Sequence, residues 1–78
     1  MNEQNVFETV RDIIVDITEI DAGEIGEDSS MMDDLSLSSV EVLTVISAVE
    51  DAFSLRIPEK KLRSFVTVSD LVQYVIHS

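Results

Sequence analysis

The sequence lacks cysteine and tryptophan, and its 78 residues include only two glycines and one proline. Without cysteine, the chain excludes disulfide frameworks, thiolate metal centres and cysteine nucleophiles, so the fold depends on packing alone. No apolar run approaches the roughly 18 residues that cross a membrane, and the first four residues carry no basic side chain of the kind that begins a signal peptide. We therefore expect one small domain over residues 1–78, located in the cytoplasm.

Basic residues are also scarce. The chain contains five Lys and Arg and sixteen Asp and Glu, which gives a formal net charge of −11. Twelve acidic residues and no basic residue lie between Arg11 and Arg56, whereas four of the five basic residues lie between positions 56 and 63. Such an acidic surface repels nucleic-acid phosphates and anionic headgroups. We expect a monomer that binds neither nucleic acid nor membranes and whose protein partners present basic patches.

Apolar residues recur at steps of three and four along the first twenty positions, a spacing that places them on one face of an α-helix. The members of this stripe are Val6, Phe7, Val10, Ile13, Ile14, Ile17 and Ile20. We expect the helix to end near Asp21, Ala22 and Gly23, because glycine readily adopts the backbone conformation that ends helices. A long loop over residues 21–38 follows, and its length favours a functional role. The expected core anchors of this loop are Ile25, Met31, Met32 and Leu35.

A second helix is predicted from Val40 to Phe53. Its inward face consists of Val42, Val45, Ile46, Val49 and Phe53. Ser38 followed three residues later by Glu41 matches a capping box, the reciprocal pair that satisfies free backbone amides at a helix start. A short third helix is expected after Pro58, since proline suits a first helical turn.

A fourth helix is predicted to begin within residues 67–70, where a threonine can cap it. Its inward face consists of Val68, Leu71, Val72, Val75 and Ile76. The run over residues 65–68 is too short to build a sheet. The sequence therefore predicts an all-α fold, a small four-helix bundle with three longer helices, one short helix and a long loop between the first two helices.

The residues present exclude two functions, namely serine hydrolysis and calcium binding by a helix-loop-helix motif. A serine hydrolase needs a base, and the sole histidine, His77, is the penultimate residue, where chain ends usually fray. A calcium loop starting at Asp21 would place Gly23, Ile25 and Met32 where oxygen ligands are needed. No catalytic residue and no metal site is therefore predicted.

A serine used as an attachment point remains. Ser39 lies in the first turn of the second helix, where free amides and the positive end of the helix dipole favour a phosphate ester. From position alone, the simpler explanation is that Ser36, Ser38 and Ser39 only cap and solvate the helix end.

Four segments follow one another in a recognisable order, namely residues 34–41 (DLSLSSVE), 48–53 (AVEDAF), 57–58 (IP) and 67–75 (TVSDLVQYV). Over nearly the whole chain they resemble the acyl carrier protein family. That family's signature reads Asp-Leu-Gly-x-Asp-Ser-Leu, followed by an acidic helix, a Phe, an Ile-Pro pair and a final Thr-Val-x-Asp helix. The spacing from Ser39 to Phe53 and Pro58 fits this pattern without gaps.

The resemblance implies that a phosphopantetheinyl transferase moves 4′-phosphopantetheine from coenzyme A onto Ser39, giving a flexible thiol arm that holds acyl groups as thioesters. It implies a carrier, not an enzyme, that serves acyl-transferring and synthase enzymes of fatty-acid, polyketide or specialised lipid biosynthesis. It also implies that basic patches of these enzymes recognise the second helix. The residues that match the recognition surface are Val40, Glu41, Leu43, Ser47, Glu50 and Asp51.

The chain departs from the family pattern beside the modified position. Ser36 replaces the signature glycine, and Ser38 replaces the aspartate that helps to engage the transferase. Thr44 and Ser47 replace an acid and a bulky apolar residue on the recognition face, so we expect atypical partners and a specialised pathway. Two alternatives stay open. One is an aminoacyl or peptidyl carrier, which usually has a less acidic recognition helix, and the other is an interaction module of the same fold that carries no arm.

Overall fold

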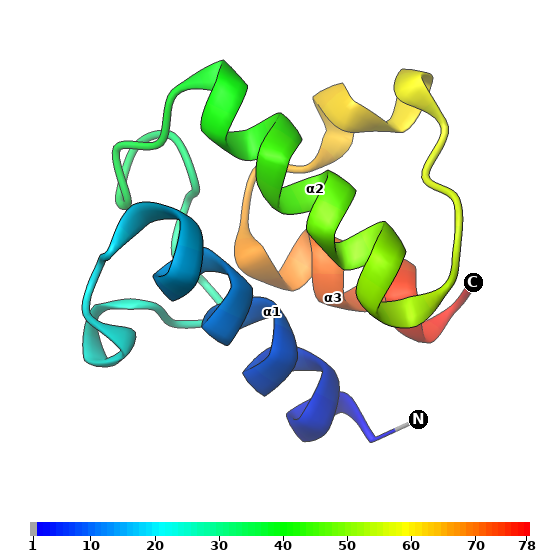
Figure 1. Ribbon diagram of the computed structural model, residues 1–78, viewed down its shortest axis with the longest axis horizontal. Helices are drawn as coiled ribbons and strands as arrows, with labels where there is room; N and C mark the ends of the chain where they lie inside the picture. The colour runs from blue at the N-terminus through cyan, green and yellow to red at the C-terminus, as the bar shows by residue number, and fades with distance from the viewer. Residues whose placement is uncertain (1) are drawn as a thin grey trace.

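The computed structural model describes residues 2–78 (Figure 1). It contains three α-helices, α1 (Glu3–Thr18), α2 (Ser39–Phe53) and α3 (Val68–Ile76), and two 3-10 helices, η1 (Ala22–Glu24) and η2 (Glu59–Ser64). α1 packs against both α2 and α3, within an envelope of 27 × 26 × 19 Å. The predicted all-α bundle is confirmed, with η2 as its short helix and a long loop between α1 and α2. The single turn η1 within that loop was not expected.

α1 ends before the expected boundary near Gly23. Glu19 takes the left-handed backbone conformation that closes the helix, with a φ of 61°, and both glycines of the chain keep negative φ. The Thr18 hydroxyl donates to the carbonyl oxygen of Ile14 at 2.7 Å and accepts from the N–H of Ile20 at 3.3 Å. The helix therefore ends at Thr18, because Glu19 leaves the helical conformation and the Thr18 hydroxyl takes the N–H of Ile20, which in a longer helix would donate to the oxygen of Asp16.

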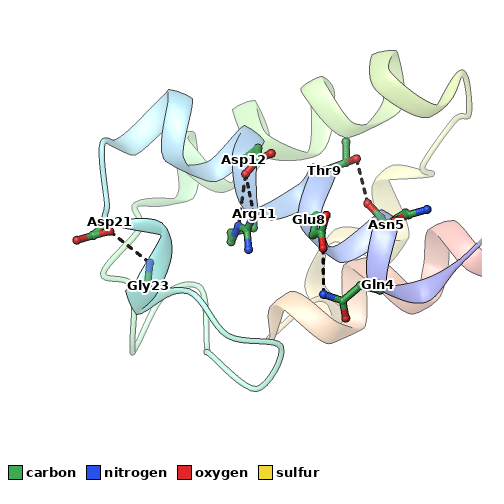
Figure 2. Close-up of polar contacts among 8 residues, drawn as sticks. All are labelled: Gln4, Asn5, Glu8, Thr9, Arg11, Asp12, Asp21 and Gly23. Carbon is green, nitrogen blue, oxygen red and sulfur yellow. Dashed lines mark hydrogen bonds and ion pairs between the residues drawn. The ribbon is translucent and has the colours of Figure 1, made fainter.

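The outward face of α1 carries short-range polar contacts (Figure 2). Gln4 donates to the carboxylate of Glu8 at 3.0 Å, and the Arg11 guanidinium lies 3.2 Å from the carboxylate of Asp12. The latter is the single ion pair among residues 2–78, and its exposure means that it contributes little to stability. Nearly all acidic side chains of the described chain therefore lack a cationic partner.

We expect added salt to raise the melting temperature. Carboxylates without counter-charges repel one another in the compact state, and salt screens that repulsion, because the Debye length falls from about 30 Å at 0.01 M to about 10 Å at 0.1 M. Circular dichroism should therefore show a Tm several degrees higher in about 0.3 M than in about 0.01 M sodium chloride. Addition of sucrose at low salt gives the control for general stabilisation. A Tm that does not change with salt contradicts this expectation.

In the described part of the chain, fifteen apolar side chains are buried, and they come from the three α-helices and the segments between them. They are Val6, Val10 and Ile14 of α1; Ile25, Met31, Leu35 and Leu37 of the loop; Val45, Ile46 and Val49 of α2; Ile57; and Val68, Leu71, Val72 and Val75 of α3. The expected loop anchors Ile25, Met31 and Leu35 are confirmed. Met32 was wrongly assigned to the core, since 55% of it is exposed. Its neighbour Met31 fills the core, and the adjacent side chain therefore points away from it.

Main-chain hydrogen bonds fasten the loop to the start of α3. The N–H of Met31 donates to the oxygen of Val66 at 2.9 Å, and the N–H of Val68 donates to the oxygen of Ser29 at 3.0 Å. The residues between these bonds form an isolated antiparallel bridge, in agreement with the expectation that the run 65–68 is too short for a sheet. We call this contact between residues 29–31 and 66–68 the clasp.

Asp70 holds the α3 side of the clasp. Its carboxylate accepts from the N–H of Val66 at 2.8 Å and of Thr67 at 3.0 Å, while the Thr67 hydroxyl accepts from the N–H of Asp70 at 3.2 Å. These contacts complete a capping box, so the cap predicted within residues 67–70 is confirmed. The bonds from the backbone N–H groups of Thr67 and Val66 hold the pKa of the Asp70 carboxyl below its ordinary value.

We expect Asp70→Asn to lower the free energy of unfolding by about 1–2 kcal/mol at neutral pH, because a neutral amide oxygen is a weaker acceptor than a carboxylate. The pKa is lower in the folded than in the unfolded state, so the wild-type advantage is fully present above the unfolded value of 3.8. It disappears as the pH falls through the folded value. Urea unfolding of both proteins at about pH 7, 5 and 3 measures the difference, and a difference independent of pH contradicts this assignment.

Candidate functional site

Ser39 is the first residue of α2, and Ser38 caps that helix. The Ser38 hydroxyl accepts from the N–H of Glu41 at 3.2 Å, and the Glu41 carboxylate accepts from the N–H of Ser38 at 3.0 Å. The predicted capping box is therefore confirmed. No group among residues 2–78 accepts from the N–H of Ser39 or Val40. These amides give the helix start a partial positive charge with free donors.

An open groove of about 530 Å³ lies beside Ser39. Its lining residues are Ser30, Met32, Asp33, Ser39, Val42, Leu43, Leu62, Arg63, Phe65 and Val66. One wall is the first half of α2, and the other is formed by η2 and the residues around the clasp. The fold thus brings residues 62–66, which lie more than 20 positions further along the chain, to the same groove as the Ser39 hydroxyl.

Exposed apolar side chains gather at this groove. Among residues 2–78 the large apolar residues that are exposed are Met32, Val40, Leu43 and Val66. Three of the four line the groove, and Val40 directly follows Ser39. Leaving apolar surface in water costs about 25 cal/mol per Å², so a cluster of this kind marks a site of contact with a ligand or partner.

The three serines near the start of α2 have different environments. The Ser38 hydroxyl is engaged in the cap, and Ser36, with a φ of 56°, lies outside the groove lining. Ser39 is exposed and lines the groove, and its hydroxyl bonds to no other group among residues 2–78. An exposed hydroxyl beside free amides and an apolar groove fits a phosphate ester whose attached chain lies along the groove.

The positions matched to partner recognition fall into two groups. The exposed ones are Val40, Leu43, Ser47 and Asp51. Glu41 and Glu50 are half-buried, and their carboxylates already accept hydrogen bonds, that of Glu50 from the N–H of Ile57 at 2.8 Å. Glu50 thereby ties α2 to the segment before η2. The outer surface of α2 consequently offers more free apolar surface than free carboxylate.

Sequence reasoning missed the wall of the groove opposite α2. This wall contains Leu62, Arg63, Phe65 and Val66. It also missed Met32, which was assigned to the core. One sequence feature could have indicated these residues. The segments that contain them are too short to bury all their apolar side chains on a helical face, so some of these side chains have to be exposed and available for contact.

We expect Ser36→Gly to raise the free energy of unfolding by about 0.5–1 kcal/mol. Ser36 has a φ of 56°, a left-handed conformation that costs an L-residue roughly 1–2 kcal/mol and glycine almost nothing. The greater flexibility of glycine in the unfolded chain offsets part of this gain. Urea unfolding measures the change, with Ser38→Gly as control, because Ser38 has a φ of −77°. A less stable Ser36→Gly protein contradicts the strain argument.

Comparison with known proteins identifies the family. A family model described as a phosphopantetheine attachment site matches residues 8–75. An acyl carrier protein of Clostridium acetobutylicum is 40% identical over 70 residues, which cover 90% of this chain and 91% of that relative. The chain belongs to the acyl carrier protein family. Acyl carrier proteins of two Tropheryma whipplei strains, Twist and TW08/27, are each 32% identical over 76 residues, covering 97% of this chain and 93% of each relative.

Members of this family carry a covalently attached 4′-phosphopantetheine and act as carriers, not as enzymes. They interact with a phosphopantetheinyl transferase and with biosynthetic enzymes. The predicted family, cofactor and carrier role are therefore confirmed. No helix formed by residues 2–78 is long and apolar enough to cross a bilayer.

Proposed function

We propose that Ser39 is the attachment residue of this carrier and that it holds acyl intermediates as thioesters for partner enzymes. The observation that carries this proposal is the environment of Ser39, which is exposed and lines the apolar groove, and whose hydroxyl makes no hydrogen bond to any of the described residues 2–78. Ser38, one residue earlier, has its hydroxyl engaged in the helix cap. The local structure therefore favours Ser39 over its neighbour.

In the modification step the Ser39 oxygen bonds to the phosphorus that bears pantetheine in coenzyme A. The diphosphate bond breaks, adenosine 3′,5′-bisphosphate leaves, and the hydroxyl proton passes to a base of the transferase. The free N–H groups of Ser39 and Val40 stabilise the negative charge of the resulting phosphodiester. The attached thiol supplies the sulfur that this cysteine-free chain lacks.

The groove supports an acyl cargo over an aminoacyl one. Most of its lining residues are apolar, Val42, Leu43 and Phe65 among them, and this surface shelters a hydrocarbon chain from water, whereas Asp33 is the one carboxylate there for a charged amino group. We propose fatty-acid, polyketide or specialised lipid synthesis as its setting, and favour a specialised pathway because Ser38, Thr44 and Ser47 depart from the family pattern. A cytoplasmic location stays a prediction.

Loading of the modified protein tests the proposal. The purified chain is incubated with coenzyme A and a phosphopantetheinyl transferase from the same organism, then with an acyl-transferring enzyme and an acyl donor. We expect the intact mass to rise by one phosphopantetheine and then by one acyl group, and hydroxylamine to remove only the latter. A chain that never gains the first group is an armless interaction module, and efficient turnover by general fatty-acid synthase enzymes contradicts specialisation.

A further inference from the structure

Four of the five basic residues of this carrier lie close together in the chain and are exposed. Arg56, Lys60, Lys61 and Arg63 all lie on η2 or just before it, and all four are exposed. None of them pairs with an acidic side chain among residues 2–78. We call these four residues the cationic surface. In a chain of net charge −11, residues 56–63 combine four basic side chains with one acid, Glu59, so this stretch favours contact with a negatively charged group.

The cationic surface adjoins the attachment site. Arg63 and Ser39 line the same groove, which is bounded by η2 on one side and α2 on the other. Figure 1 shows η2 on the side of α2 away from α1. An enzyme that approaches the Ser39 hydroxyl from the groove side therefore comes close to Arg63.

The backbone below this surface is anchored. Ile57 is buried and donates its N–H to the Glu50 carboxylate, and the Tyr74 hydroxyl donates to the carbonyl oxygen of Arg56 at 3.3 Å. Leu62 packs against the core from within η2. The positive charges thus occupy a surface whose position is fixed before binding, which favours recognition by a partner of matching shape.

A compact acidic patch fits this surface better than an extended polyanion. An extended polyanion that contacts η2 also approaches the surrounding carboxylates of a chain of net charge −11, so repulsion offsets the attraction. A protein can instead place a few carboxylates against η2 and basic or apolar groups against the rest. On α2 itself, the carboxylates of Glu41 and Glu50 are partly engaged within the chain, which leaves Asp51 as the exposed acid of that helix.

We propose that the cationic surface docks onto an acidic patch of the phosphopantetheinyl transferase that modifies Ser39. This inference rests on the proposed function of Ser39 and adds a second electrostatic contact, opposite in sign to the one expected at α2. It predicts that a transferase from the same organism carries adjacent basic and acidic patches. A transferase that presents only basic charge is expected to modify this chain slowly.

Charge reversal at one position tests the inference. Arg63→Glu and the control Arg11→Glu each change the net charge from −11 to −13, but Arg11 lies on α1 and pairs with Asp12. With apo protein, coenzyme A and the transferase from the same organism, we expect Arg63→Glu to lower kcat/KM at least tenfold, mainly through KM. The double variant Lys60→Glu/Lys61→Glu should act in the same direction. Arg11→Glu should stay within twofold of the wild type.

The outcomes separate the two proposals. Equal kcat/KM for Arg63→Glu and Arg11→Glu, with Tm values showing both proteins folded, overturns the docking inference alone. A wild type that gains no phosphopantetheine overturns the proposed function and the docking inference with it. Binding of wild type, but not of Arg63→Glu, to phosphatidylglycerol vesicles or heparin at physiological salt would assign the surface to a polyanion and overturn the inference. Higher salt should reduce the difference in kcat/KM between the wild type and Arg63→Glu, because salt screens the charges.

Discussion

Replacing Ser39 with alanine is expected to abolish the addition of phosphopantetheine. The phosphoester needs the serine oxygen, and alanine removes that atom while favouring the helix in which it lies. Because Ser39 is exposed and its hydroxyl makes no hydrogen bond to another residue in 2–78, the variant should fold as the wild type does. Intact mass after incubation with coenzyme A and a transferase should show the added group in the wild type and none in Ser39→Ala.

The neighbouring serines supply matched controls for this experiment. Ser36→Ala and Ser38→Ala should still gain one phosphopantetheine. Ser38→Ala should also lose about 1 kcal/mol of stability, because the N-terminal cap of α2 loses the oxygen that accepts from Glu41. If Ser39→Ala still gains phosphopantetheine, or if only Ser38→Ala fails to gain it, the attachment residue has been assigned to the wrong serine.

The second large effect is expected at Met31, the loop residue most deeply placed in the core. Met31→Ala should lower the free energy of unfolding by about 2–4 kcal/mol, because it deletes a fully buried side chain and leaves a cavity. Domains of this size are stable by only about 5 kcal/mol or a little more, so the loss approaches the whole stability. Urea unfolding followed by circular dichroism measures it.

Met32→Ala is the control, since the same side chain is removed one position further on. Met32 is 55% exposed, so the change in stability should stay within about 0.5 kcal/mol. The same substitution should instead weaken the binding of an acyl chain, because Met32 lines the groove. Equal losses of stability in the two variants would contradict the assignment of Met31 to the core and of Met32 to the groove.

The helices and their inward faces were predictable because their apolar residues repeat with the helical period, and the caps at Ser38 and Thr67 have local signatures. The end of α1 was not. It coincides with the left-handed backbone of Glu19 and with the bond from the N–H of Ile20 to the Thr18 hydroxyl, and no spacing pattern shows either of them. Local rules therefore predict where a helix lies better than where it stops.

The candidate site was predictable at Ser39 and not across the groove. Ser39 lies in a sequence motif. Arg63 and Val66 line the same groove although they lie more than 20 positions after Ser39 in the chain, so only the tertiary fold brings them there. The role of Glu50 shows the same limit. Its sequence position indicates partner recognition, which stays a prediction, and gives no sign that its carboxylate accepts from the N–H of Ile57, seven residues further on. Such hydrogen bonds follow from the tertiary fold, and the spacing of residues in the sequence does not predict them.

The clasp has a consequence for how such a site changes during evolution. The bonds between residues 29–31 and 66–68 join main-chain atoms, which every residue except proline can supply in full. The frame of the groove is therefore largely independent of the side chains that face into it. Met32 and Val66 can vary in size or polarity while that frame persists, so a lineage can acquire a different cargo preference without first rebuilding its fold.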